Sequence, residues 1–148
     1  MPEPLYLEDL TVGQTFTSRT HELDAEQIKR FAREFDPQYF HTDEEAAKDS
    51  FFGGLAASGW QVASITMRLL VETVPAGNGM IGAGVEITWP RPTRPGDILQ
   101  VTCEVTEIRP SRSKPDRGMV TLRSETHNQK GELLQVLTSK QLFFKRAG

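Results

Sequence analysis

The segment SGWQVASITMRLLVETV, residues 58–74, most constrains the fold of this 148-residue chain. At helical spacing its apolar side chains spread around much of the circumference: Trp60, Ala63, Ile65, Leu69 and Leu70. A helix that is apolar on most of its sides is buried and does not lie on a surface. We therefore predict one long buried helix, and the rest of the chain has to supply the layer that covers it.

Strands are predicted to supply that layer. Five segments have the β-branched and aromatic content, or the alternation of apolar and polar residues, that is typical of strands: 14–23, 82–90, 100–107, 119–127 and 132–144. In the third segment Val101, Cys103 and Val105 fall on one face, so Cys103 is predicted to pack in the core. A Pro-Gly turn in RPGD precedes this segment, and a turn at 128–131 joins the last two.

Two shorter helices are predicted between the first strand and the buried helix. Asp24 is a good N-cap for the first, in which apolar residues repeat at helical spacing. This helix should stop at Asp36, because the residue before Pro37 is disfavoured in the α conformation. The run Thr42 to Glu45 matches a capping box and predicts that the second helix follows Thr42. The glycines at 53 and 54 then break the chain.

These elements predict an α+β fold with a single domain over residues 1–148, in which an antiparallel sheet of about five strands wraps one central helix. The net charge of −3 argues against a nucleic-acid partner, and no apolar run is long enough for a membrane span. The N-terminus lacks the pattern of a signal peptide, and the single cysteine fits a reducing compartment. The expected location is the cytoplasm.

Asp36 and His41 are the candidate catalytic pair. They sit five residues apart in FDPQYFHTD, between the end of one predicted helix and the start of the next. A tight turn there would bring a carboxylate against an imidazole, and such a pair can hold a water molecule and move its proton. The alternative is a helix-terminal carboxylate and a histidine that only tie down a loop.

Ser58 and Gly59 are the candidate oxyanion-binding residues. Ser58 to Gln61 matches a capping box, in which the Ser58 hydroxyl would accept a hydrogen bond from the amide of Trp60 or Gln61. The Gly59 amide is then left without an acceptor at the positive end of the helix, which suits a developing oxyanion. A glycine that only allows close packing is the alternative. The three histidines and one cysteine show no metal-ligand spacing.

At these residues the sequence resembles the MaoC-like, (R)-specific enoyl-CoA hydratases of the hot-dog fold. The positions of Asp36, His41, Phe52 and Gly59 match the spacing of the family motif, and the order of elements agrees over nearly the whole chain. Four residues depart from the motif: Gln38, Tyr39, Leu55 and Ser58. A serine still caps a helix, so the oxyanion argument stands, whereas Gln38 and Tyr39 could alter how His41 is held.

The resemblance implies a lyase that hydrates a trans-2-enoyl thioester, or dehydrates the matching 3-hydroxyacyl thioester. Asp36 and His41 would activate the water, and the Gly59 amide would bind the thioester oxygen. Coenzyme A would be part of the substrate, and no metal or other cofactor is expected. Two alternatives stay open: a hot-dog thioesterase, and a hot-dog protein that binds acyl thioesters without turnover.

Two expectations concern partners. Open edge strands favour a homodimer or a dimer-based oligomer. Six basic residues flank the predicted strand ends and a loop rich in proline and serine: Arg91, Arg94, Arg109, Arg112, Lys114 and Arg117. Arginine could grip the phosphates of coenzyme A, but solvated loop charges are the more common explanation, and none of the six is taken as a site residue. His21 and His127 are likewise expected to be solvated.

Overall fold

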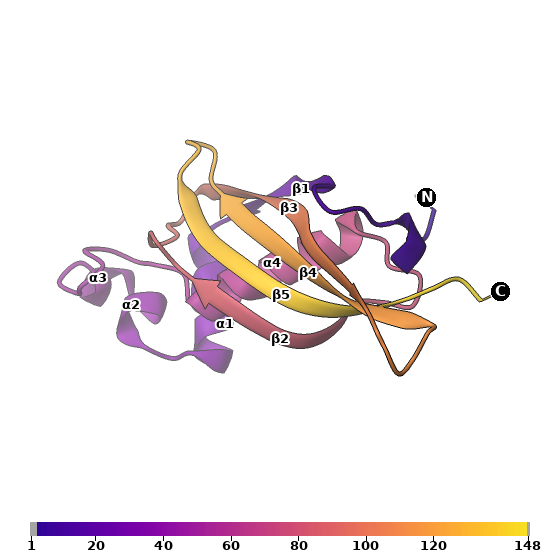
Figure 1. Ribbon diagram of the computed structural model, residues 1–148. Coiled ribbons are helices and arrows are strands. Elements are labelled where there is room, and N and C mark those ends of the chain that lie inside the picture. Colours follow the sequence, from indigo (N-terminus) through magenta and orange to yellow (C-terminus); the bar gives the residue numbers. More distant parts are fainter. Residues whose placement is uncertain (1–2, 148) are drawn as a thin grey trace.

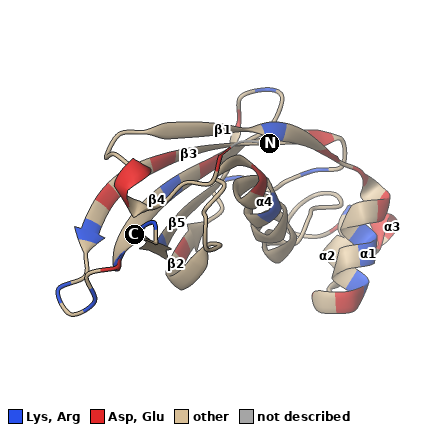
Figure 2. Cartoon of the chain, turned by 90° about the vertical axis from the view of Figure 1, so that its right-hand side faces the viewer, with Lys and Arg blue, Asp and Glu red and all other residues tan. Residues whose placement is uncertain are grey.

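The computed structural model describes residues 3–147, and Figure 1 shows one antiparallel sheet curved around a long helix. The strands are β1 (Thr15–Leu23), β2 (Ile81–Thr88), β3 (Asp97–Pro110), β4 (Arg117–His127) and β5 (Leu133–Phe144). Their order in the sheet is β1-β3-β4-β5-β2. The helix, α4 (Gly59–Thr73), lies under the arch that the sheet forms in Figure 2. The predicted α+β hot-dog fold is confirmed.

The shorter helices gather at one end of the sheet. They are α1 (Ala25–Phe35), α2 (Tyr39–Thr42) and α3 (Glu44–Ala47), and a 3-10 turn, η1 (Leu7–Asp9), precedes β1. Asp24 caps α1 as predicted, since its carboxylate accepts a hydrogen bond from the Gln27 amide over 2.9 Å. In Figure 1 these helices lie at the opposite end from the β3–β4 hairpin. The sheet therefore has one helical end, where the candidate site lies.

The core lies between α4 and the concave face of the sheet. In β3 the alternation predicted from the sequence is observed, and Val101, Cys103 and Val105 are all buried. They pack with Leu69 and Leu70 of α4. A second apolar cluster fills the helical end of the domain: Leu23, Ile28, Ala47, Leu55, Ala57, Val62, Leu99 and Leu134. This second cluster packs α1, α3 and the loop before α4 against the sheet.

Helix α4 is buried on the side that faces the sheet and open on the other. Val62, Leu69 and Leu70 are almost fully buried, whereas Trp60 is 61% exposed and Val71 is 52% exposed. The expectation of burial on most sides is therefore wrong for the single chain. The reason is geometric, because one curved sheet covers only one side of a helix.

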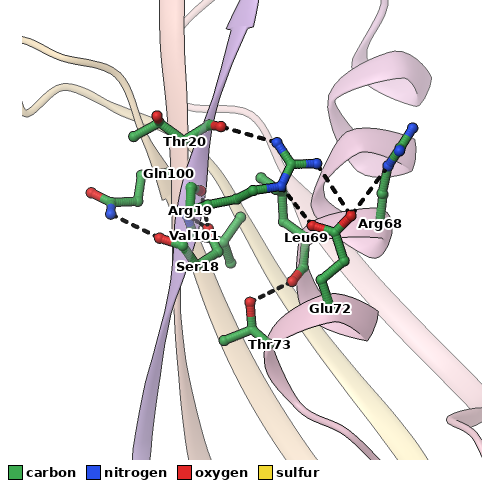
Figure 3. Close-up of polar contacts among 9 residues, drawn as sticks. All are labelled: Ser18, Arg19, Thr20, Arg68, Leu69, Glu72, Thr73, Gln100 and Val101. Atoms are coloured by element: carbon green, nitrogen blue, oxygen red, sulfur yellow. Dashed lines mark hydrogen bonds and ion pairs between the residues drawn. The ribbon is translucent and has the colours of Figure 1, made fainter. Parts of the chain in front are cut away.

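A bulge in β1 lets a polar link form between the sheet and α4 (Figure 3). The register with β3 shifts between Thr17 and Thr20, and the Ser18 hydroxyl accepts a hydrogen bond from the Val101 amide over 3.0 Å. Arg19 then reaches Glu72 on α4, with Nε 2.7 Å from Oε1. The bulge thus turns an arginine of an edge strand toward the helix.

No helix within residues 3–147 is both long and apolar enough to cross a membrane.

Candidate active site

Asp36 lies at the C-terminal end of α1, where Pro37 stops the helix. Its amide still donates to the Ala32 carbonyl over 2.9 Å, so the residue belongs to the last helical turn. Two side chains donate to its carboxylate: Gln38 Nε2 to Oδ1 over 2.6 Å, and the Ser58 hydroxyl to Oδ2 over 2.7 Å. The half-buried carboxylate is therefore held at both oxygens.

His41 is buried and is oriented by a backbone carbonyl. It lies in α2, a single helical turn between Asp36 and α3 that the sequence reading missed. Its Nδ1 is 2.6 Å from the Ala56 carbonyl oxygen, and its Nε2 is 3.4 Å from Asp36 Oδ2. Because a carbonyl only accepts hydrogen bonds, Nδ1 carries a hydrogen, and in the neutral imidazole Nε2 is the free acceptor. The predicted pairing of Asp36 with His41 is present.

The helix that follows His41 begins one residue later than predicted. Asp43, not Thr42, is the N-cap of α3, and its carboxylate accepts hydrogen bonds from the amides of Glu45 and Ala46. Thr42 instead closes α2, where its hydroxyl donates to the Gln38 carbonyl. The capping-box reading of Thr42 was wrong because an aspartate directly after it is an equally good cap.

Ser58 caps α4, as predicted, and also holds the candidate base. Its hydroxyl oxygen accepts a hydrogen bond from the Trp60 amide over 3.3 Å while it donates to Asp36. Gln61 does not complete the capping box, since its amide group donates to the Gln27 carbonyl. Ser58 is fully buried, so the structure assigns it to holding Asp36 and α4, and the expected direct contact with substrate is not supported.

Gly59 is the first residue of α4, and its amide donates no hydrogen bond within residues 3–147. A large aromatic side chain lies against this glycine. A Cβ added to Gly59 would lie 2.6 Å from two carbons of the Trp89 indole. Trp89 therefore packs directly on the glycine, so close packing by itself requires a glycine here, and the amide beside it is a candidate donor.

The Trp89 indole is anchored by a chain of buried polar groups. Its Nε1 donates to Gln135 Oε1 over 2.9 Å, and Gln135 Nε2 donates to the Thr66 hydroxyl over 2.9 Å. The Thr66 hydroxyl also shares a hydrogen bond with that of Thr126. Gln135, Thr66 and Thr126 are fully buried, so the ring position is set from inside the core.

Asp36, His41 and Gly59 all line one pocket with a volume of about 500 Å³. Aromatic rings form much of its remaining wall: Phe51, Phe52, Trp60 and Trp89. Phe52 lies close to the His41 ring, with 6.0 Å between the centroids. The pocket therefore combines a carboxylate, an imidazole and an unpaired amide with apolar walls, which suits an apolar substrate that carries one reactive carbonyl.

Asp36 stays ionised to lower pH than an ordinary aspartate. Burial by itself raises the pKa of this carboxyl group, but the hydrogen bonds from Ser58 and Gln38 and the neighbouring His41 outweigh it. The net effect is a pKa below the usual value of 3.8. At neutral pH the group is a carboxylate that accepts hydrogen bonds and can orient a water molecule.

The six basic residues do not behave alike. Arg109 and Arg117 pair with the neighbouring Glu107 and Asp116 near the β3–β4 hairpin. In Figure 1 this hairpin lies at the end of the domain opposite α1, α2 and α3. Arg91 lines the pocket and pairs with Glu132 over 2.9 Å. Arg94 is not a solvated charge, because its guanidinium donates to three backbone carbonyls of the loop before α4.

Three residues of the site are not predicted from the sequence: Ala56, Trp89 and Arg94. The local signal for Arg94 is the compact turn RPGD, and Ala56 and Trp89 have none.

The fold and the site define the class: an α+β hot-dog domain that carries an Asp–His pair beside the N-terminus of its central helix. Residues 9–128 match the model of the family described as "MaoC like domain". The chain belongs to this family of MaoC-like dehydratases. The similarity extends beyond the pair, since the match spans every helix and strand except β5 and η1's first residues.

Three known proteins illustrate the relationship. The crystal structure of the MaoC-like dehydratase from Rhodospirillum rubrum is 57% identical and superposes with a TM-score of 0.95, covering 97% of this chain and 99% of that one. The uncharacterized protein YdeM of Bacillus subtilis is 39% identical, covering 84% of this chain and 88% of the relative. The 3-hydroxybutyryl-CoA dehydratase of Methylorubrum extorquens is 32% identical, covering 74% of this chain and 69% of the relative.

Proposed function

We propose that this protein is a hydro-lyase that adds water to a trans-2-enoyl thioester to form an (R)-3-hydroxyacyl thioester, or catalyses the reverse dehydration. The observation that carries the proposal is that Asp36, His41 and Gly59 line one pocket, and that the Gly59 amide donates no hydrogen bond within residues 3–147. Hydration of a thioester-conjugated double bond needs these three groups: two to handle one water molecule, and one to stabilise negative charge on the carbonyl oxygen.

In the hydration direction, a water molecule lies between Asp36 and the unprotonated Nε2 of His41. Asp36 accepts a proton as the water oxygen bonds to C3, and the C2=C3 π electrons move toward the thioester carbonyl. The resulting enolate oxygen is held by the Gly59 amide at the helix N-terminus. The proton that Asp36 accepted passes to His41 Nε2 and from there to C2, so that Asp36 is an ionised carboxylate again and the elements of one water molecule have been added in total. Dehydration is the same sequence reversed.

The reaction as proposed involves no metal or redox cofactor, because the thioester itself makes the C2 proton acidic. The carrier is proposed to be coenzyme A, which is supported by the name of the Methylorubrum relative. That name also makes the four-carbon substrate the first one to test. The aromatic walls formed by Trp60, Trp89 and Phe52 suit an acyl chain without charge.

A homodimer is part of the proposal. Strand β2 is at an edge of the sheet, and its Ile81 and Val85 are 45% and 60% exposed. Met67 and Val71 on the open side of α4 are exposed as well. A second copy would cover these apolar side chains and pair the open edge. Sedimentation of the wild type and of Val85→Glu tests this, and a monomeric wild type would contradict it.

The test of activity is an assay of the purified protein with trans-2-enoyl-CoA substrates, beginning with the four-carbon compound and extending the chain. Loss of absorbance of the conjugated thioester, with an (R)-3-hydroxyacyl product on chiral chromatography, is the expected result. Release of free thiol would identify a thioesterase instead. Saturable binding of the thioester without any turnover would identify a binding protein and contradict the proposal.

A further inference from the structure

The guanidinium of Arg94 holds the loop between α3 and α4 by its backbone. Nη1 donates to the carbonyls of Gly54 and Leu55 over 3.1 and 3.3 Å, and Nη2 donates to the carbonyl of Phe52. Within the part of the chain that the structure describes, no carboxylate accepts a hydrogen bond from this guanidinium. An arginine used in this way acts as a rigid planar fork that fixes the carbonyls in one arrangement.

The backbone of Arg94 is held in a hydrogen-bonded turn. Arg94 to Asp97 form a tight turn, closed by a hydrogen bond from the Asp97 amide to the Arg94 carbonyl over 3.1 Å. Asp97 Oδ2 accepts the Arg94 amide over 2.9 Å, and Gly96 adopts a positive φ of 90° that suits a glycine. Because the amide and the carbonyl of Arg94 both make hydrogen bonds, the Cα position of Arg94 is fixed relative to the loop that its side chain contacts.

The held loop leads directly to the carbonyl that orients His41. The Ala57 amide donates to the Thr93 carbonyl over 2.9 Å, and the Ala56 amide donates to the Phe40 carbonyl over 3.1 Å. The Ala56 carbonyl is thus flanked by bonded amides while it accepts His41 Nδ1 over 2.6 Å. Thr93 and Arg94 hold the chain on both sides of the point where it meets the imidazole.

The proton on Nδ1 decides what His41 can do. While the Ala56 carbonyl stays in place, Nδ1 carries the hydrogen, and Nε2 of the neutral ring, which lies 3.4 Å from Asp36 Oδ2, is left to accept a hydrogen bond from a water molecule. Were the loop free to move, the carbonyl could turn away and the other neutral tautomer would become populated. That tautomer presents an N–H to the water site and cannot accept a proton there.

We propose that Arg94 is a positioning residue, which sets the tautomer and orientation of His41 through the loop at residues 52–56. The proposal rests on the function proposed above for the Asp36–His41 pair, but its structural part can be measured without any activity. Arg94 does not line the pocket with that pair, so its effect is transmitted by the backbone.

Two substitutions of Arg94 separate the role of its charge from that of its planar set of hydrogen-bond donors. Arg94→Met removes every donor and keeps the length of the side chain, whereas Arg94→Lys keeps the charge and loses the planar fork. Arg109→Met is the matched control, because Arg109 is an exposed arginine near the distant hairpin. Near-native Tm values would show that the variants fold.

The readout is the ¹⁵N–¹H correlation spectrum of the histidine rings, in which the two neutral tautomers have different nitrogen shifts. The protein has three histidines, and His41 is assigned with the His41→Gln variant. The expected wild-type signal is the Nδ1–H form. In Arg94→Met and Arg94→Lys the expected signal shifts toward a mixture of the two tautomers, with unchanged spectra of His21 and His127. Arg109→Met should match the wild type.

Kinetics supply the second readout. A small displacement of a catalytic group lowers kcat by up to about 100-fold, so both Arg94 variants should lose kcat with a smaller change in KM. A wild-type His41 spectrum in a folded Arg94 variant overturns the positioning role, whether or not activity falls. Where Arg94→Met does not fold, Arg94→Lys decides. If the His41 spectrum shifts but the wild type hydrates no enoyl thioester, the proposed function fails and the positioning role stands.

Discussion

The Ser58 hydroxyl donates to Asp36 Oδ2 over 2.7 Å, and it joins two residues that are 22 positions apart in the sequence. The same oxygen accepts the Trp60 amide at the start of α4. One small side chain therefore connects the candidate base to the helix end that carries the candidate oxyanion donor. The relative position of the two groups is set by a direct bond and not by the loops between them.

Ser58→Ala is expected to raise the pKa of Asp36. Burial raises this pKa, and the hydrogen bond from the Ser58 hydroxyl lowers it. Without the hydroxyl, the effect of burial is less fully offset and the pKa rises. Because the ionised form is the active one, the acid limb of the pH profile of kcat/KM should move to higher pH. The profile from acid to neutral pH measures this, and an unmoved acid limb would show that Asp36 is not the group observed.

Ser58→Ala also tests how the Ser58–Asp36 hydrogen bond contributes to the stability of the fold. A carboxylate with a lowered pKa adds stability above its ordinary pKa of 3.8, and this is lost as pH falls through the lowered value. Loss of the cap should cost about 0.5–2 kcal/mol of the free energy of unfolding at neutral pH. Ser64→Ala is a suitable control, since Ser64 is an exposed serine of the same helix whose hydroxyl donates to the Trp60 carbonyl and does not cap the helix.

Asp36→Asn and His41→Gln should each lower kcat by about 100-fold or more, as general acid–base groups commonly contribute 10²–10⁴-fold. The double variant should lose little beyond the worse single variant, because both residues act on one water molecule. Steady-state kinetics on the three proteins measure this. Near-wild-type hydration by either single variant would remove the mechanism.

The two variants should differ in stability. His41 is only 5% exposed, so its replacement disturbs a buried position. Its loss leaves the Ala56 carbonyl without its partner and should cost about 1–3 kcal/mol, whereas Asp36→Asn keeps an acceptor for Ser58. Urea unfolding of both variants provides the comparison.

Gly59→Ala should lower both kcat and Tm. Displacing an oxyanion donor costs about 10²–10³-fold in kcat, and the new Cβ would meet the Trp89 ring at 2.6 Å. Because Trp89 makes the single change ambiguous, the double variant Gly59→Ala/Trp89→Ala is compared with Trp89→Ala alone. On that background the Cβ should no longer lower Tm, and any remaining loss of kcat belongs to the amide. Equal kcat values in those two proteins would contradict the oxyanion assignment.

Gln135→Leu should destabilise the protein and loosen Trp89. Gln135 joins the indole to Thr66 in a fully buried position, and removing it leaves the polar atoms of both without this partner. Buried polar groups left unpaired cost about 1–3 kcal/mol. Chemical unfolding measures the loss, and tryptophan fluorescence of the folded variant should shift to longer wavelength. Lys140→Met, at an exposed lysine of the same strand whose side chain makes no hydrogen bond or ion pair within residues 3–147, should change neither.

Local sequence patterns determined the elements of this protein. Asp24, Pro37 and Ser58 act within one helical turn of their own positions, so both ends of α1 and the start of α4 could be predicted from neighbouring residues. The alternation in β3 reflects which side of a strand faces the core, and this too can be read from a few consecutive residues. The prediction failed at Thr42 and Asp43, where two adjacent residues compete for the same cap.

Tertiary structure alone decided how the pocket is held together. The Ala56 carbonyl meets His41 across 15 residues, and Arg94 meets Gly54 across 40. No local pattern marks such contacts, because a backbone carbonyl has no sequence signature and an arginine beside a turn is usually solvated. The spacing of Asp36, His41 and Gly59 could suggest the chemistry. Only the packing of the loop, the turn and Trp89 against α4 could set the tautomer, the direction of the carboxylate and the space in front of the Gly59 amide.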